Sequence, residues 1–311
     1  MARRVGALVV LTLVAVATVK VAGVLVGSDS TTAAPPDTGA SSLTATTLVA
    51  PTDAGGTTTA ATVDPAAGTA TTTGSTLPAA TPGGVPTAAD PALVLIAGDS
   101  DAGTFGPYLE TLLAQTGIVT TKLDYKVSSG LSRPDFFDWP AHFRETIPVV
   151  QPDIVVVTFG GNDPQGLSIA DGTFIVDMPT GAEGGDVEWR AEYAKRVGEV
   201  MDFLSADGRT LVWVGIPNDD NADVTRRLAV QNEVVQSEAL KRPQVVFIDT
   251  WKRFSGRQGN WAEYVIDPRD GVGKDVRADD GFHLNQTGAE ILALDIADAL
   301  RGVLRARGAA I

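Results

Sequence analysis

The chain has 311 residues, a formal net charge of −14 at pH 7, no cysteine and two histidines. The acidic balance argues against a nucleic-acid partner, because proteins of that class neutralise phosphates with clustered Lys and Arg. Without cysteine the chain has no disulfide, no thiolate nucleophile, no zinc–cysteine site and no lipoprotein anchor. The two histidines, His142 and His283, are far apart in the sequence, so no metal or other cofactor is expected.

Residues 1–27 predict an export segment. A basic start at Arg3 and Arg4 precedes an apolar run that Lys20 interrupts. The segment is either a secretory signal peptide, with a small-residue cleavage site at 15–17, or an uncleaved single-span anchor. Both place the rest of the chain outside the cytoplasm, in the cell envelope or secreted, and the uncleaved form adds a membrane partner.

Residues 28–91 are dominated by Thr, Ala, Gly, Pro and Ser. Such a composition buries too little apolar surface to offset the entropy of ordering, which predicts a disordered linker. The folded domain is therefore expected at 92–311.

The folded part alternates strand and helix signals. In chain order the predicted elements are a strand at 93–97, a helix at 107–115, a strand at 120–127, a helix at 139–147, a strand at 153–161, a helix at 187–208, a strand at 210–217, a helix at 221–240, a strand at 245–249 and a helix at 286–305. Regular alternation predicts a mostly parallel sheet with helices on both faces, a three-layer α/β/α sandwich. The long stretch 168–186 is expected to form a hairpin lid or a mobile loop.

Polar residues follow the predicted strands, where parallel sheets bind ligands. Ser100 follows the first strand, Gly130 the second and Asn162 the third, and Asp280 and His283 precede the last helix. A hydroxyl, backbone N–H groups, an amide, a carboxylate and an imidazole at one sheet edge are the parts of acyl transfer through a serine nucleophile.

Each catalytic candidate has a physical role. Ser100, on a tight turn at a helix start, is the expected nucleophile, and His283 takes its proton and returns it to the leaving group. Asp280 is three residues before His283 and can orient the imidazole, with Asp279 as a substitute. The candidate oxyanion-hole donors are the backbone N–H groups of Ser100 and Gly130 and the side-chain amide of Asn162.

Four charged residues near these turns are candidate substrate-binding residues: Asp99, Asp101, Arg133 and Asp163. Arg133 either holds an anionic or carbonyl group or forms a salt bridge with Asp135 or Asp138. His142 is expected at the surface or at the edge of the core, outside the catalytic set.

The turns resemble the four conserved blocks of the SGNH (GDSL-type) hydrolase superfamily. The matching residues are Gly98-Asp99-Ser100, Gly130, Gly161-Asn162-Asp163 and Asp280-Gly281-Phe282-His283. The stretches "GLSRPDFFDW" and "DDGFHLNQTG" resemble an exported bacterial subgroup labelled a domain of unknown function.

The resemblance implies a flavodoxin-like fold and esterase or acyltransferase chemistry on Ser100, His283 and Asp280, with Gly130 and Asn162 in the oxyanion hole. One residue departs from the family pattern: Asp101 follows the serine where Leu or Met is usual. A carboxylate there opposes a second developing negative charge, unless it points away or binds a cation.

These features together predict an extracytoplasmic serine esterase that removes O-acyl groups from cell-envelope carbohydrate through an acyl-serine intermediate. The expected partner is an acylated carbohydrate or a small ester, and the protein is expected to be a monomer. Two alternatives stay open at this point: an O-acyltransferase that uses the same triad, and a non-catalytic envelope protein that binds glycans and retains the fold.

Overall fold

The computed structural model describes residues 84–311. The predicted export segment and the predicted linker up to residue 83 lie outside the described residues. Within residues 84–311, no helix combines the length and the apolar character needed to cross a bilayer.

Five parallel strands form the central sheet, in the spatial order β2-β1-β3-β6-β7. This is the strand order of flavodoxin-like doubly wound folds, and its direction reverses between β1 and β3. The strands are β1 (Ala92–Gly98), β2 (Val119–Tyr125), β3 (Ile154–Thr158), β6 (Thr210–Val214) and β7 (Val245–Ile248). The predicted parallel sheet is therefore confirmed.

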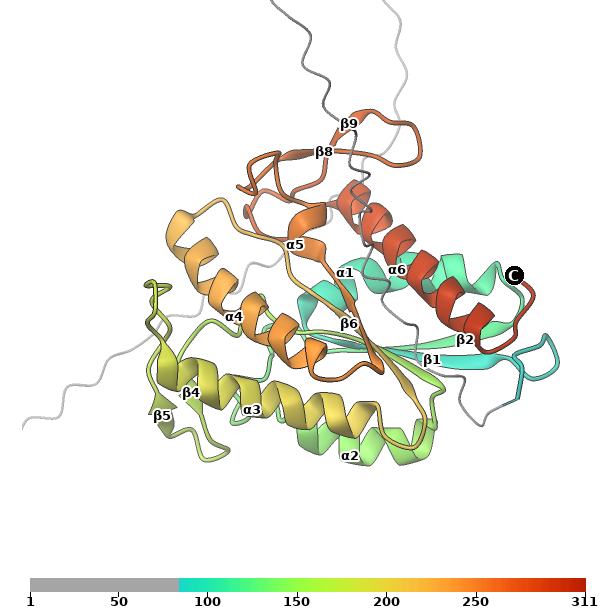
Figure 1. The fold of residues 1–311 in the computed structure, drawn as a ribbon, viewed down its shortest axis with the longest axis horizontal. Coiled ribbons are helices and arrows are strands. Elements are labelled where there is room, and N and C mark those ends of the chain that lie inside the picture. The colour runs from blue at the N-terminus through green and yellow to red at the C-terminus, as the bar shows by residue number, and fades with distance from the viewer. Residues whose placement is uncertain (1–83) are drawn as a thin grey trace, which may run out of the picture. The chain divides into compact units, whose positions relative to one another are not determined.

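Within residues 84–311, six helices accompany the sheet, and Figure 1 shows how they are arranged. Helices α1 and α6 pack against each other on one face, and α2, α3 and α4 cover the other. The helices are α1 (Ser100–Ala114), α2 (Trp139–Val150), α3 (Val187–Leu204), α4 (Ala222–Leu240), α5 (Thr250–Arg253) and α6 (Gln286–Ala306). The result is the predicted three-layer α/β/α sandwich.

Strand β1 shows how the sheet joins the two apolar layers. Val94 and Ile96 pack into the layer of α1 and α6, whereas Leu95 and Ala97 pack into the layer of α2, α3 and α4. Successive side chains of a strand point to opposite faces, so a strand covered on both sides reads as one continuous apolar run.

Two short antiparallel hairpins extend from the sandwich: β4 (Leu167–Ser168) with β5 (Phe174–Val176), and β8 (Tyr264–Ile266) with β9 (Gly273–Asp275). The first hairpin falls in the stretch for which a hairpin lid or a mobile loop was expected, and the structure shows the hairpin. The second hairpin and α5 were not predicted, because the polar sequence between β7 and α6 carries neither helical nor alternating apolar periodicity.

Helix α1 begins earlier than predicted. It starts at Ser100 and includes Pro107, which the sequence suggested as its first residue. Asp99 caps the helix, its Oδ1 accepting a hydrogen bond from the backbone N–H of Asp101 at 3.0 Å. The proline removes only one helical hydrogen bond, and the capped first turn holds the helix together upstream of it.

Candidate active site

Ser100 stands at the carboxyl end of β1, at the point where the strand order reverses. The turn before it requires glycine, since Gly98 has φ +145° and a Cβ there would lie 2.1 Å from the carbonyl oxygen of Thr158. That close approach lets β1 pass directly into α1, and Ser100 becomes the first residue of the helix. The hydroxyl thus sits at a helix N-terminus, where partial positive charge favours an anion.

Asp99 is part of this turn and not a surface group. Its carboxylate is fully buried and accepts hydrogen bonds from the backbone N–H groups of Asp101 and Gly160. Burial, then the nearby charge of Asp101, raises the pKa of Asp99 well above its usual value. The expectation that Asp99 binds substrate is corrected: the carboxylate ties the end of β3 to the start of α1.

His283 lies against the serine. Its Nε2 is 2.9 Å from Oγ of Ser100, and its Nδ1 is 2.6 Å from Oδ2 of Asp280. Oδ1 of Asp280 accepts hydrogen bonds from the backbone N–H groups of His283 and Phe282, which fixes the carboxylate. A histidine held in this way presents one ring nitrogen to the hydroxyl and the other to a carboxylate, the geometry of a general base with an orienting acid.

The electrostatics of Asp280 suit that geometry. Partial burial raises its pKa, but hydrogen bonds from the ring and the backbone of His283 outweigh burial, and the net pKa is below its usual value. Asp280 therefore stays ionised at neutral pH. The neighbouring Asp279 is exposed and contacts neither ring nitrogen by any hydrogen bond within the described residues. The tertiary structure selects Asp280 of the two.

The loop that carries Gly130 is tied to a buried carboxylate. Asp163 accepts hydrogen bonds from the backbone N–H groups of Leu131 (3.0 Å) and Ser132 (2.9 Å) and from the hydroxyl of Tyr193 (2.6 Å). A Cβ on Gly130 would lie 2.0 Å from Oδ1 of Asp163, so only glycine fits. Asp163 is fully buried, and the expectation that it binds substrate is corrected: it shapes the loop.

Asn162 lies beside the same loop. Its Nδ2 donates a hydrogen bond to the carbonyl oxygen of Ser129 at 3.1 Å, next to Gly130 in the sequence. One amide hydrogen is thus used to orient the side chain, and the other has no hydrogen-bond partner within residues 84–311. The structure brings Asn162 and the Gly130 loop together, and their role as oxyanion-hole donors with Ser100 stays a prediction.

Arg133 forms a salt bridge with Asp135, one of the two partners expected from the sequence. Its Nε and a terminal nitrogen donate to the two carboxylate oxygens of Asp135, at 2.8 and 2.7 Å. The guanidinium also lies 5.0 Å from the ring centre of Phe174 in the β4–β5 hairpin. The salt bridge uses Nε and one terminal nitrogen, and a role of Arg133 in substrate binding stays a prediction.

Arg277 is a functional candidate that the sequence did not reveal. It is 5% exposed and donates to the carbonyl oxygens of Phe282 and Phe254 and to the backbone and side-chain oxygens of Asn218. Burial lowers its pKa to about 10. Since Phe282 precedes His283, this arginine anchors the turn that presents the imidazole, and no local sequence pattern marks it.

His142 lies apart from this cluster. Its Nε2 is 2.8 Å from a carboxylate oxygen of Asp124 and 3.3 Å from the hydroxyl of Thr146. The ring also packs against Phe137 and Trp139. Every one of these contacts belongs to the α2 side of the sheet, as expected for a histidine at the edge of the core. Within residues 84–311 no group of three or more His, Asp or Glu side chains is arranged to hold a metal ion.

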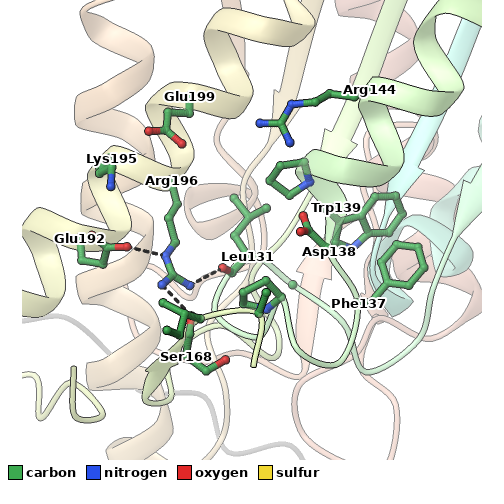
Figure 2. A pocket seen from close by; sticks show the side chains of 15 residues that line it. Leu131, Phe137, Asp138, Trp139, Arg144, Ser168, Glu192, Lys195, Arg196 and Glu199 are labelled. Carbon is green, nitrogen blue, oxygen red and sulfur yellow. Dashed lines mark hydrogen bonds and ion pairs between the residues drawn. The ribbon is translucent and has the colours of Figure 1, made fainter. Parts of the chain in front are cut away.

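A pocket of about 280 Å³ opens between α2 and α3, beside the Gly130 loop (Figure 2). Arg144 and Lys195 face it from the two helices. Arg196 forms part of its wall, donating to Glu192 and to the carbonyl oxygens of Leu131 and Ser168. Gly130 is the one proposed catalytic residue among its lining residues, so the pocket adjoins the candidate site without containing its nucleophile.

Comparison with known proteins gives the family. Residues 93–299 match the model described as "Protein of unknown function (DUF459)". The chain belongs to the DUF459 family. This confirms the expected resemblance to a group labelled as a domain of unknown function. No curated protein sequence matches this DUF459 chain.

Solved structures similar to this DUF459 protein include a lipase and an esterase, as their titles describe them. One is a GDSL-like lipase from Bacteroides thetaiotaomicron, with 13% identity, a TM-score of 0.47, and coverage of 70% of this chain and 91% of that one. The other is the acetylxylan esterase Axe2 from Geobacillus stearothermophilus, with 15% identity, a TM-score of 0.46, and coverage of 70% and 95%. Such low identities do not transfer an activity, so the chemistry of this DUF459 protein rests on its own side chains.

Proposed function

We propose that the protein is an extracytoplasmic serine esterase of the SGNH type that removes O-acyl groups from cell-envelope carbohydrate. The observation that carries the proposal is the linear chain of contacts from Ser100 Oγ to His283 Nε2 (2.9 Å) and from His283 Nδ1 to Asp280 Oδ2 (2.6 Å). These three groups belong to two segments 180 residues apart in the sequence.

The proposed reaction has two halves. His283 accepts the proton of Ser100 as Oγ attacks the ester carbonyl, and the tetrahedral oxyanion is stabilised by the backbone N–H groups of Ser100 and Gly130 and the amide of Asn162. The C–O bond to the alcohol then breaks, and His283 returns the proton to the leaving sugar oxygen. Water, deprotonated by His283, releases the acid from the acyl-serine and restores Ser100.

The envelope substrate is inferred from location. The basic and apolar start of the chain and the linker rich in Thr, Ala and Pro support an exported domain on a tether. A tethered domain outside the cytoplasm meets acylated carbohydrate, whose sugar hydroxyl is the leaving group required by the reaction. A monomer satisfies this proposal, because all three groups of the triad come from one chain.

Hydrolysis of p-nitrophenyl acetate by the purified protein tests the chemistry. The Ser100→Ala variant should lose at least about 10³-fold in kcat/KM, because the nucleophile is gone. Mass spectrometry of acid-quenched protein should find an acetyl group on the peptide that contains Ser100. Equal rates of hydrolysis for the wild type and Ser100→Ala would refute the proposal that Ser100 is the nucleophile of an esterase.

The natural substrate and the cellular location need separate tests. Release of acetate from O-acetylated glycans supports the esterase, whereas transfer of the acetyl group to an added glycan acceptor would show a transferase. Residues 1–27 fused to alkaline phosphatase, which is active only outside the bacterial cytoplasm, should give active enzyme if the export segment works as proposed. An inactive fusion would contradict export.

A further inference from the structure

Asp101 is a buried acid that the proposed reaction does not use. It follows the nucleophile directly in the first turn of α1 and is 7% exposed. Its Oδ2 is enclosed and has no hydrogen-bond partner within residues 84–311. A buried carboxylate oxygen without a partner calls for an explanation, because almost all such groups in proteins are satisfied by protein or by ordered water.

Two more unpartnered polar atoms lie around the same space. The hydroxyls of Thr158, at the end of β3, and Thr250, at the start of α5, are buried and lack hydrogen-bond partners among the described residues. Both threonines and Asp101 line one small cavity beneath α1. The remaining walls are mostly apolar, among them Phe105, Leu284 and Leu292.

The cavity has the size of one water molecule. The centre of a water molecule could occupy about 10 Å³ of this cavity. A buried water needs about that much space and two to four polar partners. Two hydroxyls and one carboxylate oxygen supply three partners, with both donors and acceptors among them.

We propose that this cavity is a binding site for one water molecule, held between Oδ2 of Asp101 and the hydroxyls of Thr158 and Thr250. The water donates a hydrogen bond to this carboxylate oxygen, which no group of residues 84–311 reaches.

Nearby charges set the protonation of this carboxyl. The charges of His283, Asp280 and Arg277 act on the pKa of Asp101, and Asp101 in turn raises the pKa of Asp99. Burial raises the pKa of Asp101 to about 6, opposed by His283 and Arg277 and reinforced by Asp280. Above that pH the carboxylate is charged, and a buried charged oxygen has the greater need of a hydrogen-bonded water. The position in the first turn of α1 favours the same charged form.

A crystal structure of the full chain, at about 1.5 Å and pH 7.5, tests the water directly. We expect one density peak at hydrogen-bond distance, about 2.6–3.2 Å, from Asp101 Oδ2, Thr158 Oγ1 and Thr250 Oγ1. An empty cavity overturns the site. Contacts near 2.4 Å from all three oxygens also overturn it, since they identify a bound cation instead of water.

Titration of Asp101 supplies a second readout. The side-chain carboxyl is followed by ¹³C NMR in the full chain and in the Thr158→Val and Thr250→Val variants, each of which removes one partner of the water. In both valine variants the titration midpoint of the Asp101 carboxyl should rise by about one pH unit, because the charged form loses the water that hydrates it. Thr250→Ser keeps the hydroxyl and should leave the midpoint in place. An unchanged midpoint in both valine variants overturns the proposal.

Discussion

Oγ of Ser100 lies 2.9 Å from Nε2 of His283, although 183 residues separate them in the sequence. The contact spans the strand–helix turn after β1 and the turn before α6. Helices α1 and α6 pack against each other along the same face of the sheet, so the pairing of these two helices sets the distance between hydroxyl and imidazole.

The choice between two adjacent aspartates can be tested by paired substitutions. Asp280→Asn should lower kcat for p-nitrophenyl acetate by about 10³–10⁴-fold, because the amide no longer holds the proton-donating Nδ1 of His283 in the productive orientation. Asp279→Asn is the matched control and should retain activity within about twofold. If Asp279→Asn lost more activity than Asp280→Asn, the residue that orients His283 would be Asp279 and not Asp280.

Asp163 is expected to matter for folding and for the loop that it holds. Asp163→Asn replaces one of the two accepting oxygens with an NH₂ group, which then faces at least one backbone N–H donor. The free energy of unfolding should therefore fall by about 2 kcal/mol. Urea denaturation measures this change. Asp177→Asn, on the exposed stretch after β5, is the control and should change stability by less than about 0.5 kcal/mol. Full stability of Asp163→Asn would contradict a shaping role.

Gly130 tests the close approach to Asp163. Gly130→Ala places a Cβ 2.0 Å from Oδ1 of Asp163, and the loop must shift to accept it. We expect a loss of about 1–3 kcal/mol in unfolding free energy, together with a fall in kcat as the backbone N–H of residue 130 moves. Gly273→Ala, where nothing lies within 4 Å of the added Cβ, is the control. Wild-type values of both stability and kcat for Gly130→Ala would show that the loop does not need glycine.

Arg277 should support the His283 turn through its planar set of donors. Lysine in its place keeps the charge but reaches fewer of the carbonyl oxygens that Arg277 satisfies, so Arg277→Lys should destabilise the protein by about 3 kcal/mol and lower kcat. Thermal unfolding and ester hydrolysis measure the two effects. Arg301→Lys, at a surface ion pair with Asp298, is the control and should be nearly neutral. Equal behaviour of the two variants would refute the anchoring role.

The pH dependence of stability should carry the signature of Asp101. Its pKa is raised to about 6 in the folded protein, above the ordinary 3.8. As pH falls from 7.5 to 5, the folded state takes up this proton before the unfolded chain does, so this group makes folding more favourable. Asp101→Asn lacks the group. The unfolding free energy of the wild type, relative to the variant, should therefore rise over this interval in urea titrations. A difference that stays constant with pH would show that Asp101 keeps an ordinary pKa.

The sequence by itself determined the architecture and the order of the functional turns. Apolar runs such as 154–158 specify strands covered on both faces, and glycine at 98 specifies the tight turn before Ser100. These signals are local, because backbone conformation and the apolar periodicity of an element depend on neighbouring residues. The order of strands and helices then restricts the sheet to a doubly wound form, which puts the turns at one edge.

Only the tertiary structure decided what each charged side chain does. Asp99, Asp163 and Arg133 stand beside the catalytic motifs in the sequence, yet all three bind other parts of the protein: two are buried acceptors of backbone N–H groups and the third is paired with Asp135. Arg277 carries no motif and still anchors the His283 turn. Burial, and the partner that a carboxylate or guanidinium finds, depend on segments brought together by folding, and sequence spacing does not encode that contact.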